Sequence, residues 1–277
     1  MKYSVVVNAR NEEENIEKTL LALRRQTVKP GQIIVVDDGS TDHTVEIARK
    51  YADIVVSLPY HKESFVGRPE LAGVINAGLE KVENDVDHVV ICGADHALEE
   101  GYVEAVIKRM EQMPRVVVAS GRIKGEPSNE THARGSGRVV NAHFWRKANG
   151  LRYPVKWGWE GWICVKAMQL GYLSRCFYDV ETAIQRRTSH DPEKMWLEGK
   201  AMYALGYDWK YVVISSIRVF LENPKAGVNM FLGWLRHEDV ERLDVTEFFN
   251  QLQKRRFWRK AVRLIRNGQV IRKLFFA

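Results

Sequence analysis

The chain has 277 residues, of which 45% are hydrophobic and 28% are charged, and its formal net charge at pH 7 is +7. This composition is typical of a folded globular protein, and it excludes a disordered or collagen-like chain. Its three cysteines form no Cys-x-x-Cys pair, which argues against a disulfide framework and against a structural zinc site. No apolar stretch approaches the roughly 18 residues of a membrane-spanning helix, and no leader precedes the first strand. We therefore expect a cytoplasmic protein with one large domain and an appendage.

The first half of the chain alternates strand and helix patterns. Short apolar runs predict strands at residues 3–7, 32–37, 54–58 and 88–92. Helical patterns follow these strands at residues 11–26, 44–51, 69–81 and 98–113. This alternating order implies right-handed crossovers and a mainly parallel sheet flanked by helices, so the predicted fold class is α/β.

The second predicted strand runs directly into acidic residues. Four apolar residues, Ile33 to Val36, precede Asp37 and Asp38 and the turn-forming pair Gly39-Ser40. An unbroken apolar run is typical of a strand buried on both faces, and ligands of parallel sheets collect beyond the carboxyl ends of the strands. These carboxylates either accept hydrogen bonds from a nucleobase or ribose, or belong to an ordinary capped turn.

A second acidic turn follows the fourth predicted strand, where Asp95 and His96 come shortly after Cys92. If the two strands are close in the sheet, Asp95 can reach a divalent cation while Asp38 holds a base or ribose. Carboxylate oxygens suit Mg²⁺ or Mn²⁺. An isolated acidic turn is the alternative, but the recurrence of acids at two strand ends favours a shared site.

A third segment, Trp157-Gly158-Trp159-Glu160-Gly161-Trp162, places three tryptophans around one carboxylate. Apolar neighbours make a carboxylate a stronger base by desolvation, so Glu160 is a candidate general base. The indole faces of Trp157, Trp159 and Trp162 are candidate platforms for the sugar rings of an acceptor. The alternative is an aromatic core cluster in which Glu160 is only a negative charge at a helix N-terminus.

Together these motifs resemble those of family 2 glycosyltransferases, inverting enzymes of the GT-A fold that use nucleotide-sugar donors. The resemblance covers about residues 2–207 and is carried by the stretches Val5 to Glu12 and Val36 to Asp42 and by Asn76-Ala77-Gly78. It implies a Rossmann-like GT-A catalytic domain in residues 1–207, with a mixed, mainly parallel sheet. Residues 208–277 would then form a helical C-terminal extension.

The resemblance also implies roles for individual residues. Contacts with the donor nucleotide are assigned to Asn8, Ala9, Arg10, Glu12, Asp37, Asp38, Arg68 and Ala94. Asp95 is assigned to a Mn²⁺ or Mg²⁺ ion, with Gly93 in place of a usual acid and His190 as a candidate further ligand. Glu160 lies eleven residues before Gly171, the position of the family's catalytic base, although the usual Glu-Asp pair is here Trp159-Glu160.

The implied reaction is a hexosyl transfer from a UDP- or GDP-sugar to a glycan or lipid-linked acceptor, as in glycan, glycolipid or cell-envelope synthesis. Glu160 would take the proton of an acceptor hydroxyl as the oxygen attacks the anomeric carbon. A polyprenyl phosphate acceptor is already an anion and needs no base, so Glu160 would then only position it. The sequence leaves both acceptors open.

Two other functions are alternative interpretations of parts of this sequence. A sugar-nucleotide nucleotidyltransferase would need a glycine-rich phosphate loop with a basic residue after the first strand, whereas residues 8–15 supply acids. A noncatalytic membrane- or nucleic-acid-binding protein on a degenerate GT-A fold is the stronger alternative, because both acidic motifs lack a usual member.

The positive charge is concentrated in the tail. Residues 248–277 contain nine Lys or Arg and no Asp or Glu, so the remaining residues hold 33 basic and 35 acidic side chains. Apolar residues recur at helical spacing between Phe248 and Ile265, which predicts a basic amphipathic helix. Such a helix can bind an anionic membrane surface, which predicts a peripheral protein on the cytoplasmic face, or it can pack on the catalytic domain. Nucleic acid is a less favoured partner, since no recognition motif is present.

Overall fold

The computed structural model describes residues 1–126, 129–184 and 191–266, with side chains up to Phe257. The chain divides into two compact units, residues 1–189 and residues 190–277. The boundary predicted between residues 207 and 208 thus falls inside the second unit. The helix of residues 192–205, which precedes this boundary, packs with the later helices. The assignment of one unit to catalysis stays a prediction.

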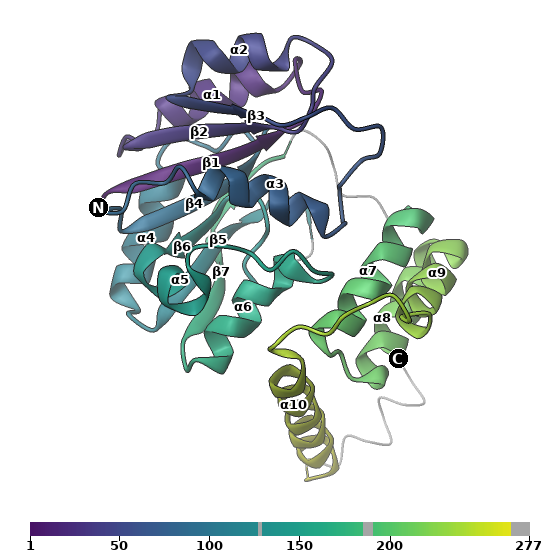
Figure 1. Ribbon diagram of the computed structural model, residues 1–277. Coiled ribbons are helices and arrows are strands. Elements are labelled where there is room, and N and C mark those ends of the chain that lie inside the picture. Colours follow the sequence, from purple (N-terminus) through teal and green to yellow (C-terminus); the bar gives the residue numbers. More distant parts are fainter. Residues whose placement is uncertain (127–128, 185–190, 267–277) are drawn as a thin grey trace. The chain divides into compact units, whose positions relative to one another are not determined.

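Unit 1 is built around a seven-stranded sheet with the order β3-β2-β1-β4-β6-β5-β7 (Figure 1). The strands are β1 (Tyr3–Ala9), β2 (Gln32–Asp37), β3 (Ile54–Ser57), β4 (His88–Gly93), β5 (Val116–Ile123), β6 (Arg138–Asn141) and β7 (Leu173–Thr182). Strands β1 to β4 are mutually parallel, β6 is antiparallel to both of its neighbours, and β5 pairs in parallel with β7. The predicted α/β class with a mixed, mainly parallel sheet is confirmed.

Helices cover both faces of this sheet. They are α1 (Ile16–Arg24), α2 (Thr44–Tyr51), α3 (Glu70–Leu79), α4 (Tyr102–Gln112), α5 (Ala142–Asn149) and α6 (Trp159–Gln169). Helices α1, α2 and α4 share one core with one face of the sheet, and α3, α5 and α6 lie over the other face (Figure 1). Every residue of β2 is buried, as its unbroken apolar run predicts.

Two helices begin later than their sequence patterns predict. The pattern at residues 11–26 gives a helix only from Ile16, and the pattern at residues 98–113 gives one only from Tyr102. A left-handed residue precedes each helix, since φ is 51° at Asn11 and 80° at Gly101. A left-handed residue breaks the helical path, so the chain must turn before the helix can start.

Unit 2 consists of helices α7 (Pro192–Leu205), α8 (Trp209–Glu222), α9 (Pro224–Leu235) and α10 (Thr246–Arg266). The first three are capped by the side chains of Asp191, Asp208 and Asn223, which accept hydrogen bonds from the first backbone amides. Gly199 and Gly233 let α7 and α9 touch along their backbones, because a Cβ at either position would lie 2.1 Å from a carbonyl oxygen of the facing helix. In the described residues, α7 thus packs with the helices that follow it.

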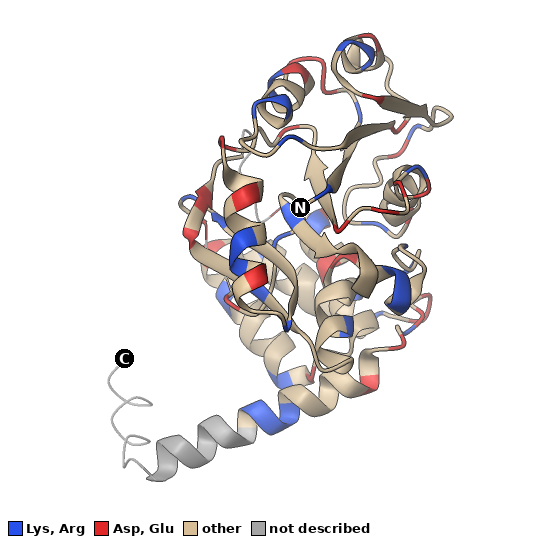
Figure 2. Ribbon diagram, turned by 90° about the vertical axis from the view of Figure 1, so that its left-hand side faces the viewer, with Lys and Arg blue, Asp and Glu red and all other residues tan. Residues whose placement is uncertain are grey.

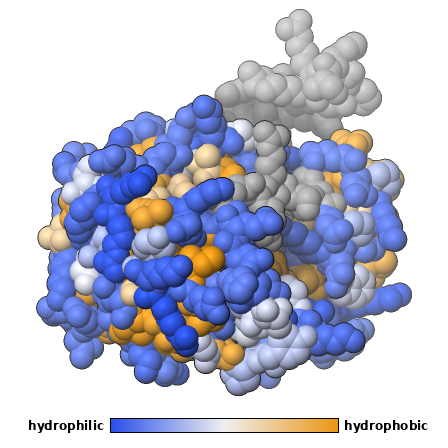
Figure 3. All heavy atoms as spheres, turned by 90° about the horizontal axis from the view of Figure 1, so that it is seen from above, coloured by the Kyte–Doolittle hydropathy of each residue, from blue (hydrophilic) through white to orange (hydrophobic). Residues whose placement is uncertain are grey.

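The surface of the molecule is mixed in character. Hydrophilic residues predominate on the face seen in Figure 3, with apolar residues in separate groups between them. In the ranges that the structure describes, no helix combines the length and the apolar character needed to cross a bilayer.

Candidate functional site

The site predicted from the sequence lies at the carboxyl ends of β1, β2 and β4, which are neighbours in the sheet. The chain builds outward from β1 through β2 to β3, and then returns to place β4 on the other side of β1. Ligands of open α/β sheets bind at such a reversal point. The amide of Asp38 donates to the oxygen of Ala9 at 2.9 Å, and the amide of Ala94 donates to the oxygen of Asn8 at 3.1 Å. The turns that carry Asp38 and Asp95 therefore flank the end of β1.

The turns after β1 and β2 are tied to each other. The Asn11 side-chain oxygen accepts from the amide of Thr41 at 2.9 Å, and the Asn11 amide donates to Ser40 Oγ at 2.9 Å. Asp37 is buried, and its Oδ1 accepts from the amide of Ser40 at 3.2 Å. The amide of Glu12 donates to Oγ1 of Thr44, the first residue of α2, at 2.8 Å. Asp37 thus forms the capped turn that the sequence allowed, while the next residue is left to face the site.

Asp38 is surrounded by cationic and aromatic side chains. Its carboxylate is 7% exposed, accepts from His61 Nε2 at 2.9 Å, and lies 4.0 Å from the guanidinium of Arg10. The His61 ring stacks on Phe65 with centroids 3.7 Å apart. Arg10 also donates to the backbone oxygen of Glu63 at 2.6 Å. These contacts fix the segment after β3 over the carboxylate that is predicted to bind the nucleotide.

Asp95 occupies a turn that depends on glycine at position 93. A Cβ on residue 93 would lie 2.9 Å from Asp95 Oδ1, so the missing side chain leaves the space that this carboxylate uses. The Gly93 amide donates to Ser136 Oγ at 2.9 Å, and Ser136 Oγ also lies 2.7 Å from His96 Nδ1. His96 is fully buried and bonds Thr182 through its other nitrogen. Burial, aided by nearby Arg134, lowers the pKa of His96 to about 4, so His96 is a neutral structural residue near pH 7.

Glu160 lies in the first turn of α6, with its side chain 56% exposed. A Cβ on Gly135 would lie only 2.1 Å from Glu160 Oε1, so the glycine makes room for the carboxylate. The guanidinium of Arg138 is fully buried, donates to the backbone oxygen of Glu160 at 2.8 Å, and lies 4.0 Å from Oε1. A buried cation thus holds the beginning of α6 while the carboxylate stays open to solvent.

The three tryptophans do not enclose Glu160 in the way that the sequence suggested. Trp159 and Trp162 are buried, and Trp159 Nε1 donates to the backbone oxygen of Arg68 at 3.0 Å while its ring packs on Tyr153. Trp157 is only partly buried. Helical geometry explains the difference, because residues that follow one another on a helix point in different directions. Trp159 and Trp162 therefore belong to an aromatic core cluster, the alternative that the sequence left open. Trp157 is exposed enough to contact an acceptor.

A continuous series of contacts joins Asp38, Asp95 and Glu160. His61, at the start of the segment 61–68, binds Asp38. The backbone oxygen of Arg68, at the end of this segment, accepts from Trp159, the residue before Glu160. Residues 135–136 then pack on Glu160 and bind the amide of Gly93 beside Asp95. The structure thus brings the three predicted acids, with Arg10 and Arg68, to one edge of unit 1.

A divalent cation fits this edge only in part. Asp95 offers a partly exposed carboxylate, the type of ligand that Mg²⁺ and Mn²⁺ prefer. Within residues 1–126, 129–184 and 191–266, no three His, Cys, Asp or Glu side chains form a group that could hold a metal ion. The predicted ligand His190 lies outside the described residues. An ion at Asp95 would therefore need most of its ligands from the diphosphate of the donor and from water.

Sequence reasoning missed several residues of this site: His61, Gly135, Ser136 and Arg138. Their partners are distant in the chain, since His61 lies 23 residues from Asp38 and Arg138 lies 22 residues before Glu160. The only local signal was the glycine-rich stretch before Arg138, which indicates a tight approach of the backbone but not what it approaches.

The sequence also matches a known family. The family model described as Glycosyl transferase family 2 covers residues 4–174, more than half of the chain. The chain belongs to this family. The glycosyltransferase GlyA of Streptococcus pneumoniae is 30% identical over 109 residues, which are 39% of this chain and 15% of that protein. The chain spans less than half of the length of each of several relatives that it matches.

Solved glycosyltransferase structures share the fold of this family 2 chain. The mannosyltransferase PcManGT from Pyrobaculum calidifontis, in complex with GDP-Man and Mn²⁺, superposes with a TM-score of 0.58 at 16% identity, over 99% of this chain and 87% of that one. Glucosyl-3-phosphoglycerate synthase from Mycobacterium tuberculosis, in complex with Mn²⁺, UDP and glucosyl-3-phosphoglycerate, gives 0.54 at 16% identity, over 73% and 78%. The predicted GT-A fold is confirmed.

Proposed function

We propose that the protein is an inverting glycosyltransferase that moves a hexose from a nucleoside diphosphate sugar to a hydroxyl or polyprenyl phosphate acceptor. The observation that carries this proposal is the set of contacts that links the turns of Asp38 and Asp95 at the carboxyl ends of β1, β2 and β4 with the start of α6 at Glu160. Family membership and the nucleotide-bound relatives of the same fold support it.

The donor nucleotide is assigned to the edge formed by β1 and β2. Asp38 is mostly buried beside Arg10 and His61, so its carboxylate can accept hydrogen bonds from a base or ribose in a site that excludes water. Arg68 lies at the end of the same segment and is the candidate contact for the diphosphate. Binding of the donor must open or reshape the contact between His61 and Asp38, because both would use the same carboxylate.

Asp95 is the residue proposed to hold Mn²⁺ or Mg²⁺ together with the diphosphate. When bound, such an ion offsets the negative charge on the departing diphosphate. The role of this chain is to present one carboxylate. The absence of a side chain at Gly93 leaves the space that the carboxylate uses, and the bond from the Gly93 amide to Ser136 holds the turn. A second acid at position 93 would collide with Asp95 as it is placed here.

Glu160 is the proposed base for a hydroxyl acceptor. It would accept the hydroxyl proton as the acceptor oxygen forms a bond to the anomeric carbon and the bond from that carbon to the diphosphate breaks. Attack from the face opposite the diphosphate inverts the configuration. The exposure of Glu160 supports this role because an acceptor arriving from solvent can reach it.

We also infer that the protein works at the cytoplasmic face of an anionic membrane. Helix α8 exposes large apolar side chains, with Ile217 55% and Leu221 80% exposed, although such residues are usually covered. The described part of α10 carries Lys254, Arg255 and Arg256, and Figure 2 shows this basic stretch. Exposed apolar residues and cations are the two features that bind a protein to an anionic bilayer.

The test is turnover with a panel of UDP- and GDP-sugars, with and without Mn²⁺, for the wild type, Glu160→Gln and the control Glu111→Gln on α4. We expect Glu160→Gln to keep donor binding but to lose transfer to a hydroxyl acceptor by at least about 100-fold, the usual contribution of a general base. The control should behave as the wild type. Turnover of Glu160→Gln at the wild-type rate would remove the base assignment.

A thermal-shift screen with nucleoside diphosphates and Mn²⁺ tests the donor site separately. A ligand that binds only the native state raises the melting temperature, so the diphosphate that stabilises the wild type identifies the base of the donor. Asp38→Asn should lose this stabilisation. Absence of turnover with every donor, combined with retained vesicle or oligonucleotide binding, would favour the noncatalytic alternative.

A further inference from the structure

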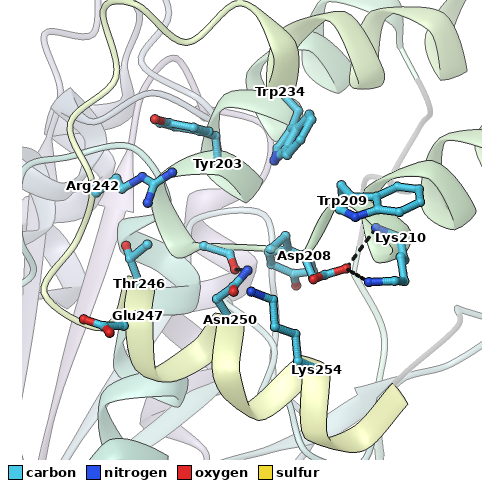
Figure 4. Close-up of a pocket in the computed structure, with 12 residues that line it drawn as sticks. Tyr203, Asp208, Trp209, Lys210, Trp234, Arg242, Thr246, Glu247, Asn250 and Lys254 are labelled. Atoms are coloured by element: carbon cyan, nitrogen blue, oxygen red, sulfur yellow. Dashed lines mark hydrogen bonds and ion pairs between the residues drawn. The ribbon is translucent and has the colours of Figure 1, made fainter. Parts of the chain in front are cut away.

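Unit 2 contains a cavity of about 570 Å³. It lies between the turn from α7 to α8, the end of α9, the segment before α10 and the first turns of α10 (Figure 4). Its volume falls in the range of pockets that hold small ligands. Among the described residues, those that line it all belong to unit 2.

The walls of this cavity are held by hydrogen bonds between α10 and the turn after α7. Thr246 Oγ1 donates to the oxygen of Ala204 at 2.6 Å, and the amide of Asp208 donates to Gln253 Oε1 at 2.8 Å. Gly206 has φ of +88°, and a Cβ there would lie 2.4 Å from the oxygen of Thr246. The cavity is therefore a built feature of the fold and not a gap between loosely packed helices.

Among the residues whose side chains the structure describes, three cations from different segments line the cavity: Lys210, Arg242 and Lys254. Lys210 is compensated by Asp208 at 3.2 Å. Within the described part of the chain, neither Arg242 nor Lys254 forms an ion pair with an acid. Figure 4 shows the Lys254 ammonium directed toward the interior and the Glu247 carboxylate at the outer edge. The interior therefore carries uncompensated positive charge, which favours an anionic ligand.

Aromatic rings complete the lining. The Arg242 guanidinium lies 4.9 Å from the centroid of the Tyr203 ring, which orients it without neutralising it. The Nε1–H group of Trp234 is buried and has no hydrogen-bond partner among the described residues. Figure 4 shows this nitrogen on the side of the indole ring that faces Asp208 and the cavity. A buried donor without a partner is rare in folded proteins, and a bound ligand is one explanation for it.

We propose that this cavity binds a phosphate ester, with Arg242 and Lys254 pairing with the phosphate oxygens and Trp234 Nε1 donating to the ligand. A phosphate accepts several charge-assisted hydrogen bonds at once, which matches a guanidinium and an ammonium that converge from different segments. The proposal does not rest on the transferase activity, because the described residues that line the cavity all lie in unit 2, whereas the predicted acids lie in unit 1.

Two carriers could bring such a phosphate, a membrane lipid or a soluble sugar or glycerol phosphate. The position of the cavity favours a lipid. Trp209, which lines it, is 57% exposed and begins α8, the helix whose apolar residues Ile214, Ile217 and Leu221 form an exposed row at helical spacing. A lipid head group in the cavity would leave its chains beside this row.

The experiment compares the full-length wild type with Arg242→Gln/Lys254→Gln in two binding assays. The first is cosedimentation with phosphatidylcholine vesicles that contain or lack phosphatidic acid, and the second is tryptophan fluorescence on titration with glycerol 3-phosphate. The matched control is Lys225→Gln/Arg236→Gln, which removes the same charge from exposed positions of unit 2 outside the cavity. We expect the affinity of the cavity variant for phosphatidic acid vesicles or glycerol 3-phosphate to fall at least about tenfold, and that of the control to fall much less. The reason is that charge-assisted hydrogen bonds to a phosphate are stronger than neutral ones.

A second variant, Trp234→Phe, tests the unpaired donor. It keeps an aromatic ring against Phe231 but removes the N–H group, so its melting temperature should stay near that of the wild type while its affinity for phosphate falls. Binding to vesicles alone identifies a lipid carrier, and binding in both assays identifies the phosphate as sufficient; both results support the site. Wild-type affinity in the cavity variant, or loss of affinity equal to that of the control, would overturn it.

Discussion

At the scale of single residues, Glu160 depends on a glycine that is distant in the sequence. Gly135 lies against the carboxylate so closely that a methyl group would overlap it, whereas the atoms nearest to that methyl belong to the flexible end of Glu160. The main chain around Glu160 is held independently, by the buried guanidinium of Arg138. A substitution at Gly135 can therefore displace the Glu160 carboxylate without loosening the main chain at the start of α6.

Gly135→Ala is expected to lower turnover strongly while the free energy of unfolding changes by no more than about 1 kcal/mol. The half-exposed Glu160 side chain can move aside at small cost, but it then loses its productive position, and small misplacements of a catalytic group are expensive in rate. Steady-state kinetics and urea unfolding measure the two quantities. The double variant Gly135→Ala/Glu160→Gln should be no slower than Glu160→Gln alone; fully additive losses would show that Gly135 acts elsewhere.

The acids of the site could be predicted because each follows a strand or opens a helix within a recognisable local pattern. Asp38 and Asp95 follow apolar runs, and the strand order then puts their turns on the two sides of the end of β1. His61 and Arg138 could not be predicted, because their functions consist of contacts made only after the chain has folded. The same reason explains the buried positions of Trp159 and Trp162, where composition suggested a binding surface but packing placed the rings in the core.

At the scale of elements, helix α3 shows how two glycines on one helix can differ. Gly78 faces the sheet, and a Cβ there would lie 2.6 Å from Val6 Cγ1 and 2.7 Å from Val36 Cγ2. Gly73 lies on the same helix with no atom within 4 Å of its virtual Cβ. The close approach of α3 sets the distance between this helix and the strands that carry Asp38.

We expect Gly78→Ala to destabilise the protein by about 1–3 kcal/mol, the usual cost of overpacking a core. The matched change Gly73→Ala should be neutral or stabilise by about 0.5–1 kcal/mol, because alanine is the better helix former. Chemical denaturation of both variants gives the comparison. Equal effects of the two changes would mean that α3 does not pack on β1 and β2 as closely as described.

The types of the early elements were predictable, whereas several boundaries were not. Strand patterns gave β1 to β4 to within a residue or two, because buried parallel strands are unbroken apolar runs. The late start of α4 follows Gly101, and α1 starts five residues after Asn11; both residues are left-handed, and although both types favour that conformation, neither is restricted to it. The antiparallel insertion of β6 between β4 and β5 is a matter of long-range pairing, which local patterns do not encode.

At the scale of the whole molecule, the start of α10 makes packing contacts, whereas most of the basic residues of the tail come later in the sequence. The first turns of α10 hold unit 2 together, since Phe249 packs on Tyr207 and Gln253 binds the amide of Asp208. The start of this helix thus packs within unit 2. The predicted membrane segment extends beyond it into residues 267–277, which lie outside the described residues. Residues 258–277 still hold six of the nine basic residues of the tail.

Ending the chain after Phe257 should therefore keep unit 2 folded but weaken binding to anionic vesicles by at least about 100-fold, because each Lys or Arg near such a surface contributes about 1 kcal/mol. The residual binding should also depend less on salt than that of the full chain, since fewer charges remain to be screened. Vesicle sedimentation at several salt concentrations measures both effects.

The full-length variant Ile217→Ser/Leu221→Ser is the matched comparison. It should bind more weakly than the wild type yet keep the steep salt dependence, because it changes only the apolar row of α8. Unchanged sedimentation of the shortened chain would remove the tail from the membrane-binding surface and leave α8 as its main candidate.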